Sequence, residues 1–462
     1  MTDFEHAQKN TVVRRLGAKR NRPKALAADK PERRSALQRQ LAFFFLVPWA
    51  LDYRAEVANG GVGGSVFQFL ILATSAFSAI ALIATTKSGY RYQKGWRRLM
   101  TLWTVFMVYS VVAGTLQGVA FSHLIRILLP FVLCMLGMAV GAILAMDARN
   151  LDALVLWIGV AAVVSEVWTA VYALTGMGLT SDTVRYRILS PLSVYLIAVP
   201  VCMFVYGQRK HMPSTVAGML LAGAVVLISQ TRTELIVIVV VVGALFLYSR
   251  GHKHLATQGT ARRAGKKASL LPKVLAAAAL VGVSGMIAIK VNPDIFDQFA
   301  GRIMAANDAQ GDATALTRIA EAAGEIEAMR RSPATMLFGL GIGSDHSWDV
   351  SYIIDIAADQ GEETDVWYLG HIGWLYQFYA SGLLFGWVLP FVFLITIRNG
   401  WRSSNPLFGA AVVCVFSAYL FQGFLAHPMG SRAGAVACGL MIGAAAVRPT
   451  DQRSAAEPGR KI

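Results

Sequence analysis

Residues 214–248 read STVAGMLLAGAVVLISQTRTELIVIVVVVGALFLY, and this stretch indicates the class of fold. It holds two apolar runs joined by a short polar turn at Arg232. A helix that crosses a bilayer needs ~20 mostly apolar residues, and somewhat fewer when flanking side chains reach the interface. The stretch therefore predicts two membrane-spanning helices that follow one another directly.

The rest of the chain also has the composition of a membrane protein. Its 462 residues are 55% hydrophobic and 15% charged, and the mean hydropathy is +0.50. The net charge of +16 does not indicate nucleic-acid binding, because the lysines and arginines are concentrated in short segments between apolar runs. All four cysteines lie inside apolar runs, and their spacing predicts neither a disulfide framework nor a metal site.

Apolar runs of spanning length recur twelve times along the chain. The first is interrupted by Pro48, Asp52 and Arg54, and the tenth is long enough to tilt or to break near Gly382. The expected spans are 41–56, 65–86, 98–115, 124–146, 152–175, 189–206, 214–230, 233–248, 271–290, 370–397, 406–425 and 431–447.

The charges between these spans predict an orientation, because cytoplasmic loops retain Lys and Arg. The first 40 residues hold 11 Lys/Arg against 4 Asp/Glu, and 249–273 holds seven Lys/Arg and no acid. Counting alternately from a cytoplasmic N-terminus places these segments, and the basic stretches at 87–98 and 208–211, on the cytoplasmic side. The stretch 291–369, with 14 Asp/Glu and 4 Lys/Arg, then falls on the outer side.

We therefore expect an all-α integral membrane protein of about 12 transmembrane helices, with one large, partly helical outer loop between the ninth and tenth. Neither an internal repeat nor a matched pair of broken helices is visible, which weakens a transporter interpretation. The expected parts are a disordered basic cytoplasmic arm at 1–40, spans one to nine at 41–290, the outer loop at 291–369, spans ten to twelve at 370–447 and a cytoplasmic tail at 448–462.

The outer loop has two features of its own. Asp312 can cap a helix that Arg330, Arg331 and Pro333 would end. Further along, residues 338–344 read FGLGIGS; the sequence lacks the Lys of a phosphate-binding loop, so we expect close backbone packing there. The helix would lie on another part of the protein through its regularly spaced apolar positions, Leu316, Ile319, Ala323, Ile326 and Met329.

Several arginines lie at the outer ends of the expected helices, although Lys and Arg are otherwise concentrated on the cytoplasmic side. Each one alone is explained by snorkelling to lipid phosphate or by pairing with a carboxylate. Together they suit a diphosphate at the membrane surface, because a guanidinium matches phosphate oxygens two at a time. Arg187 and Arg232 are the sharpest candidates of the set, which comprises Arg126, Arg185, Arg187, Arg232, Arg318 and Arg432.

His371 is the candidate catalytic residue. It lies where the acidic loop enters the tenth span, and a neutral imidazole there could take a proton from an attacking sugar hydroxyl. A structural, hydrogen-bonded histidine is the simpler alternative, and His346 and His427 lie on the same side. The carboxylates of the loop form no calcium-binding pattern, and its aromatic residues suit an interfacial belt better than a sugar platform.

The order of these features resembles the O-antigen ligase and polymerase superfamily of bacterial envelope polysaccharide assembly, over residues 180–400. The matching features are the Arg185-Tyr186-Arg187 segment, the Thr231-Arg232-Thr233 turn, the outer loop with its Arg318 helix, the Pro333 to Gly343 stretch, and His371 followed by Leu375, Gly382, Leu383 and Gly386.

The resemblance implies a glycosyltransferase in the bacterial inner membrane with both termini in the cytoplasm. The donor would be a polyisoprenyl-diphosphate-linked glycan held by Arg187, Arg232 and Arg318, with Arg185 nearby. His371 would activate the acceptor hydroxyl of a second glycan on the periplasmic face. No metal, nucleotide or other cofactor would be needed, and the partners would be membrane lipids and the flippase and chain-length regulator of the same pathway.

Ligase-like members of the superfamily commonly have His-Asn where this chain has His371-Ile372. We therefore expect a polymerase of exopolysaccharide or O-antigen repeat units. The first alternative is an O-antigen ligase that transfers the glycan to an acceptor such as lipid A core. A transporter or flippase of a lipid-linked or anionic substrate is the second, for which Glu166 is one buried-charge candidate, and a scaffold recruited through the basic arm is the third.

Overall fold

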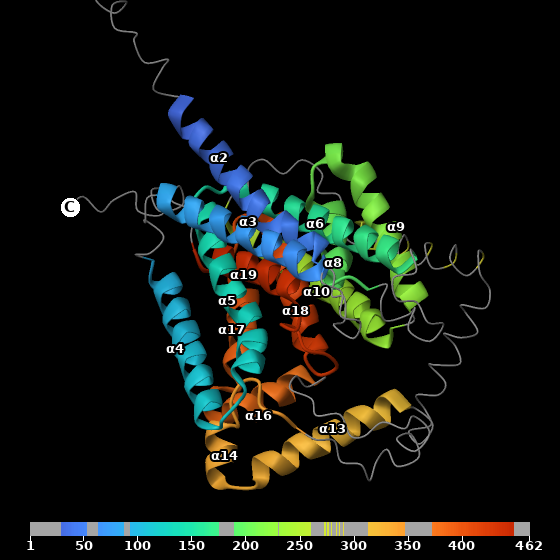
Figure 1. Ribbon diagram of the computed structural model, residues 1–462. Helices are drawn as coiled ribbons and strands as arrows, with labels where there is room; N and C mark the ends of the chain where they lie inside the picture. The colour runs from blue at the N-terminus through green and yellow to red at the C-terminus, as the bar shows by residue number, and fades with distance from the viewer. Residues whose placement is uncertain are drawn as a thin grey trace, which may run out of the picture.

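The computed structural model describes residues 29–52, 63–86, 93–174, 189–229, 231–259, 313–346 and 372–447, with single helical residues between 272 and 290. Every regular element in this part of the chain is helical (Figure 1). The helices are α2 (Asp29–Leu46), η1 (Val47–Leu51), α3 (Gly63–Thr85), α4 (Lys94–Leu116), α5 (Phe121–Leu144), α6 (Arg149–Leu174), α8 (Ser193–Tyr206), η4 (Arg209–His211), α9 (Met212–Ser229), α10 (Arg232–Gly259), α13 (Ala313–Arg330), α14 (Pro333–Phe338), α16 (Gly373–Phe385), α17 (Val388–Trp401), α18 (Pro406–Gln422) and α19 (Arg432–Ala446).

The all-helical, membrane-compatible fold is confirmed, but the expected count of twelve spans is not. Among the described residues, six helices are long and apolar enough to cross a bilayer, or seven if the bent pair α16 and α17 counts as one span. Four further apolar helices are shorter, and they coincide with the expected first, sixth, eleventh and twelfth spans. The expected ninth span, 271–290, and the tail, 448–462, lie mostly or wholly outside the described residues.

The boundary between the basic arm and the first apolar helix differs from the expectation. The helix α2 begins at Asp29, inside the arm that was expected to be disordered up to residue 40. Strong helix formers such as Arg33, Leu37 and Gln38 continue the helix outward from the apolar segment. The apolar part then ends in the short 3₁₀ turn η1, whose Pro48 stands in the first turn, where a missing N–H costs little.

The expected break in the tenth span is confirmed. Gly382 has non-helical backbone angles (φ 63°), and α16 and α17 meet at 92°. A Cβ atom at Gly382 would lie 2.2 Å from the Leu337 carbonyl oxygen, because α14 packs against α16 there. Glycine is needed at this position both for the positive φ and for the close approach.

The centre of the bundle is the pair α5 and α19, which run side by side in the same direction. Gly137 and Gly141 on α5 face Gly439 and Gly443 on α19, and each helix brings glycines against the backbone of the other. A Cβ atom at Gly443 would lie 1.9 Å from the Met138 carbonyl oxygen. Within a membrane such small-residue spacing lets helix backbones pack closely, and van der Waals contact then holds them together.

Contacts between helix termini show which termini lie together at each end of the bundle. At the basic end, where α4 begins with Lys94, Gly95 meets Ala446, and the Asn405 amide donates a 2.8 Å hydrogen bond to Asp152. At the opposite end, which we call the site end, Tyr195 donates to the Gly434 carbonyl (3.3 Å). Helix ends that charge alternation had placed on one side therefore meet at one end of the structure.

A buried ion pair joins the first and last apolar helices at the site end. The Arg432 guanidinium donates to both carboxylate oxygens of Asp52, over 2.9 and 3.0 Å. The Asp52 side chain is 4% exposed, so the pair is largely removed from solvent. This contact explains why Asp52 interrupts the first apolar segment. Of the two explanations given above for a single outer arginine, snorkelling or pairing with a carboxylate, the second holds for Arg432.

We expect Arg432→Gln to destabilise the protein by about 3–5 kcal/mol, because it leaves the Asp52 carboxylate buried without its cation. The measurement is the melting temperature of the purified protein in detergent. The double variant Asp52→Asn with Arg432→Gln should lose less than the two single variants added together. Arg398→Gln, at an exposed position, is the control; an equal loss there would contradict the assignment.

Large apolar side chains remain exposed on the outside of several spans. Phe69 and Phe77 on α3, Val108 on α4 and Val239 on α10 are each more than half exposed. Polar residues such as Ser75 and Ser110 lie inside instead, with their hydroxyls bonded to backbone carbonyls. This inverted pattern is what a lipid environment favours, because acyl chains solvate the apolar surface.

Candidate functional site

The expected site residues are only partly within the described structure. His371, Arg185 and Arg187 lie outside the described residues. Arg232 is the first residue of α10 and Arg318 lies in the second turn of α13, and both are partly buried. The elements that surround Arg232 and Arg318 and that follow His371 in the sequence define the candidate site.

The elements that carry the expected site lie at one end of the bundle. The first turn of α10 joins the start of α8, where the Ser193 hydroxyl donates to Glu234 (3.1 Å). The start of α8 in turn contacts the start of α19. At the same end, the Trp374 N–H at the start of α16 donates to the Gly423 carbonyl (2.9 Å), in the connection before α19. Arg232 and the first turn of α16, which follows His371 by two positions, thus share the site end.

The glycine-rich stretch packs as expected. The Leu340 and Gly341 N–H groups donate to the Tyr379 and Ala380 carbonyls of α16, each over 2.9 Å. Gly341 has φ 90°, and a Cβ atom there would lie 2.3 Å from the Gly114 backbone near the end of α4. The backbone N–H groups of Leu340 and Gly341 are thus used within the fold, and the stretch holds α14 and the residues after it against the end of α4 and the middle of α16 (Figure 1).

The helix expected in the outer loop is present as α13, but its packing face is not the one expected. Ile319 and Ile326 are 44% and 37% exposed, whereas Glu321 and Glu325 are each 1% exposed. Ala320, also on the buried side, is small enough for α13 to lie close to α16. The apolar spacing correctly predicted a helix; it could not show that the partner of this helix is a polar group.

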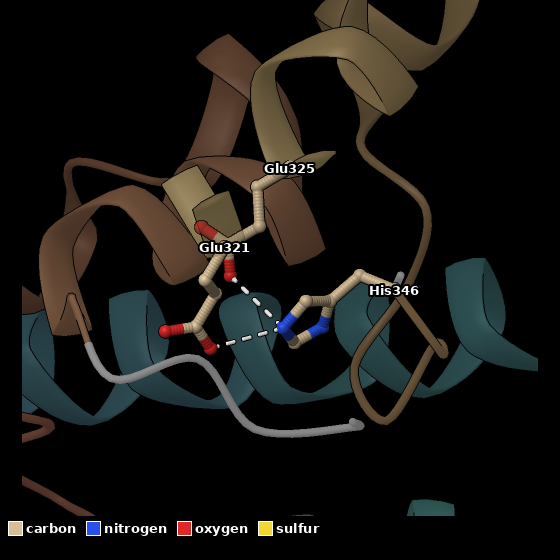
Figure 2. A group of neighbouring side chains, drawn as sticks. All are labelled: Glu321, Glu325 and His346. Carbon is tan, nitrogen blue, oxygen red and sulfur yellow. Dashed lines mark hydrogen bonds and ion pairs between the residues drawn. The ribbon is translucent and has the colours of Figure 1, made fainter. Parts of the chain in front are cut away.

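That polar group is His346, the last described residue after the glycine-rich stretch. Its Nε2 atom lies 3.0 Å from the Glu321 carboxylate and 3.8 Å from the Glu325 carboxylate. Figure 2 shows both carboxylates pointing from α13 toward the same imidazole nitrogen. The ring also packs against Tyr379 of α16, so the cluster joins three elements.

Burial of two neighbouring carboxyl groups makes this cluster energetically unfavourable without a further binding partner. Burial, and then the neighbouring Glu321 carboxylate, raise the pKa of Glu325 to about 9. Within the described residues, neither Glu325 oxygen has a hydrogen-bond partner. A buried carboxyl group without hydrogen bonds normally indicates a ligand, a proton or a functional role.

A second pair of buried carboxylates lies at the site end of the bundle. Glu166 of α6 accepts a hydrogen bond from the Ser190 N–H (3.1 Å), and Glu234 of α10 accepts from the Ser193 hydroxyl. Both carboxylates are thus held by residues just before or at the start of α8. Glu234 follows Arg232 by two positions, so this pair borders the turn that was expected to hold a diphosphate.

The start of α16 holds a third polar group. The Gln377 amide lies 3.2 Å from the Nε2 atom of His427, which stands in the connection between α18 and α19. Tyr376 packs edge-on against the same imidazole, and its hydroxyl accepts the Gly343 N–H (3.2 Å). His427 therefore packs against the first half of α16.

Sequence reasoning missed two parts of this arrangement. The Glu321 and Glu325 side chains are four residues apart and share one helix face, which is a readable signal. The apolar positions of the helix, however, predict the opposite face as the packing face. The sequence pattern links Glu166 to no second carboxylate, and only the fold brings Glu234 to the same end of the bundle. No protein-family model matches the chain, and a comparison with curated proteins finds no match.

Proposed function

We propose that this protein is a polysaccharide polymerase that joins polyisoprenyl-diphosphate-linked repeat units of an exopolysaccharide or O-antigen. The single observation that carries the proposal is the common location of its elements: the Arg232 turn, the Arg318 helix and the start of α16 after His371 gather at the site end. A reaction between two lipid-anchored glycans requires diphosphate-binding groups and a base at one membrane surface.

Within this proposal the site end faces the periplasm and the basic end faces the cytoplasm, as the charges of the connecting segments favour. Arg187, Arg232 and Arg318, with Arg185, hold the diphosphate of the donor in the inner membrane. His371 removes the proton of the acceptor hydroxyl as the new glycosidic bond forms and the lipid diphosphate leaves. The flippase and chain-length regulator of the same pathway are the expected partners.

Two buried carboxylates fit this chemistry in a further way. Glu166 and Glu234 lie beside the Arg232 turn, and each has one oxygen without a hydrogen-bond partner among the described residues. Carboxylate oxygens that are held in this way can accept hydrogen bonds from sugar hydroxyls. We propose that they border the glycan part of the donor.

The pool of lipid-linked glycans in a deletion strain tests the proposal. A polymerase leaves single repeat units on the lipid carrier when it is missing, because the preceding steps continue. A ligase would instead leave long polymer on the carrier, and a flippase would leave single units on the cytoplasmic face only. Extracted glycolipids can be separated by mass spectrometry after labelling from each face, and either of the last two results would reject the polymerase.

One observation supports the alternative function of a transporter: Glu166 and Glu234 are both buried inside the helix bundle. Paired carboxylates near the middle of a membrane mark many proton-coupled transporters. Here, however, the pair is bonded to Ser190, just before α8, and to Ser193, its first residue, near the site end and not midway along the bundle. Purified protein in vesicles that makes polymer from repeats supplied on one face would reject transport as the main activity.

A further inference from the structure

We propose that Glu321, Glu325 and His346 form a binding site for one divalent transition-metal ion, which holds the outer-loop helix α13 to the end of the glycine-rich stretch. The ion would have a structural role. The inference therefore does not depend on the proposed polymerase activity.

The geometry of the three side chains suits a shared ion. Donor atoms that bind one Zn²⁺ at about 2.0–2.2 Å lie roughly 3–3.6 Å from each other. The His346 Nε2 atom lies 3.0 Å from Glu321 and 3.8 Å from Glu325, and ligand atoms of all three residues lie within 4.8 Å of one another. Small side-chain movements would bring the three atoms around one ion.

Burial and charge favour a cation over a simple hydrogen-bonded cluster. The side chains of His346 and both glutamates are at most 1% exposed. Two carboxylates that share one buried imidazole bring negative charge into the protein interior, which is tolerated only with a counter-charge or a metal. Within the described chain Glu325 has no hydrogen-bond partner on either oxygen, although it is fully enclosed and points at the imidazole (Figure 2).

Among the described residues, the Glu325 carboxylate forms no ion pair with an arginine or a lysine. Arg318 stands one turn before Glu321 on the same helix, but its Nε atom has no hydrogen-bond partner in the described structure. Arg330 and Arg331 at the end of α13 are exposed. The cluster thus presents one nitrogen and several oxygens around a common point.

The ligand set indicates the class of ion. Imidazole suits Zn²⁺ and other transition metals, and carboxylates suit Mn²⁺ and harder ions. A mixed set of one histidine and two glutamates therefore favours Zn²⁺ or Mn²⁺ over Mg²⁺ or Ca²⁺, which prefer oxygen alone. The i and i+4 spacing of the glutamates places both on one face of α13, so a single helix supplies two of the three ligands.

Metal content and thermal stability test the site together. Full-length protein with a tag free of histidine is purified in detergent, stripped with a chelator, and incubated with Zn²⁺ or Mn²⁺ before desalting and elemental analysis. We expect about one equivalent per chain and a melting temperature that rises by several degrees on reloading. Glu325→Gln and His346→Ala should each weaken binding by at least ~10–100-fold and abolish that rise.

Glu327→Gln is the matched control, because Glu327 is an exposed carboxylate on the same helix, and it should bind metal as the wild type does. Wild-type protein that retains neither metal, or a Glu325→Gln variant with the same stoichiometry, would overturn the proposal. The sign of the stability change also discriminates. If no metal binds, Glu325→Gln leaves the melting temperature after incubation with Zn²⁺ or Mn²⁺ unchanged or higher than that of the wild type; if the ion binds, the loaded variant melts at a lower temperature than the loaded wild type.

Discussion

Replacement of His371 by alanine is expected to reduce polymer formation by ~10²–10⁴-fold, which is the contribution of a general base in the transition state. The protein should still accumulate in the membrane at the wild-type level, because the residue precedes α16 in the sequence and its substitution leaves the helix sequences unchanged. The measurement is the chain-length distribution of the polymer in a deletion strain that carries the variant. The rate on lipid-linked repeats in reconstituted vesicles gives the fold-change.

The matched control is His211→Ala. This histidine lies in η4, between the ends of α8 and α9 that face away from the site end. It should leave polymer length and rate unchanged. Full-length polymer from the His371→Ala strain, at wild-type protein level, would remove His371 from the reaction.

The largest loss of stability is expected for Gly443→Leu. A Cβ atom at this position would lie 1.9 Å from the carbonyl oxygen of Met138, and the backbone of α5 cannot yield without separating from α19. Overpacking in a well-packed core typically costs 1–3 kcal/mol and more where backbone is displaced. We expect most of the variant to be degraded or aggregated, as measured by fluorescence-detected size-exclusion chromatography of detergent extracts.

Gly243→Ala provides the contrast for this experiment. Gly243 lies within α10, and a Cβ atom there would meet nothing within 4 Å. Alanine should raise the helix propensity by up to ~1 kcal/mol and leave the folded yield equal or higher. A normal yield of Gly443→Leu would mean that α5 and α19 do not pack through their glycines.

The positions of the helices could be predicted because the bilayer imposes a length and a polarity on each span. The runs at 98–115 and 233–248 fall inside α4 and α10. The break at Gly382 was also visible, since an overlong apolar run with an internal glycine has a natural point of weakness. The number of full spans was less predictable, because the apolar parts of α8, α18 and α19 end short of a complete crossing.

The contacts of the site could not be predicted in the same way. The Asp52 carboxylate finds Arg432 at the other end of the chain, and no local pattern links two such positions. The burial of Glu321 depends on where His346 lies, which in turn depends on glycines that pack against α4 and α16. Helical periodicity identifies the faces of α13, but the neighbours determine which face is covered.

The pairing of α5 with α19 also has a consequence for folding during translation. The ribosome releases α5, which ends at Leu144, well before it reaches Arg432 at the start of α19. At ~5–20 residues per second the interval is roughly 15–60 s. During this time the glycine-lined surface of α5 has no permanent neighbour in the bilayer. The nascent chain can close its centre only after α19 has been made, so packing of this pair waits until translation has passed Ala446.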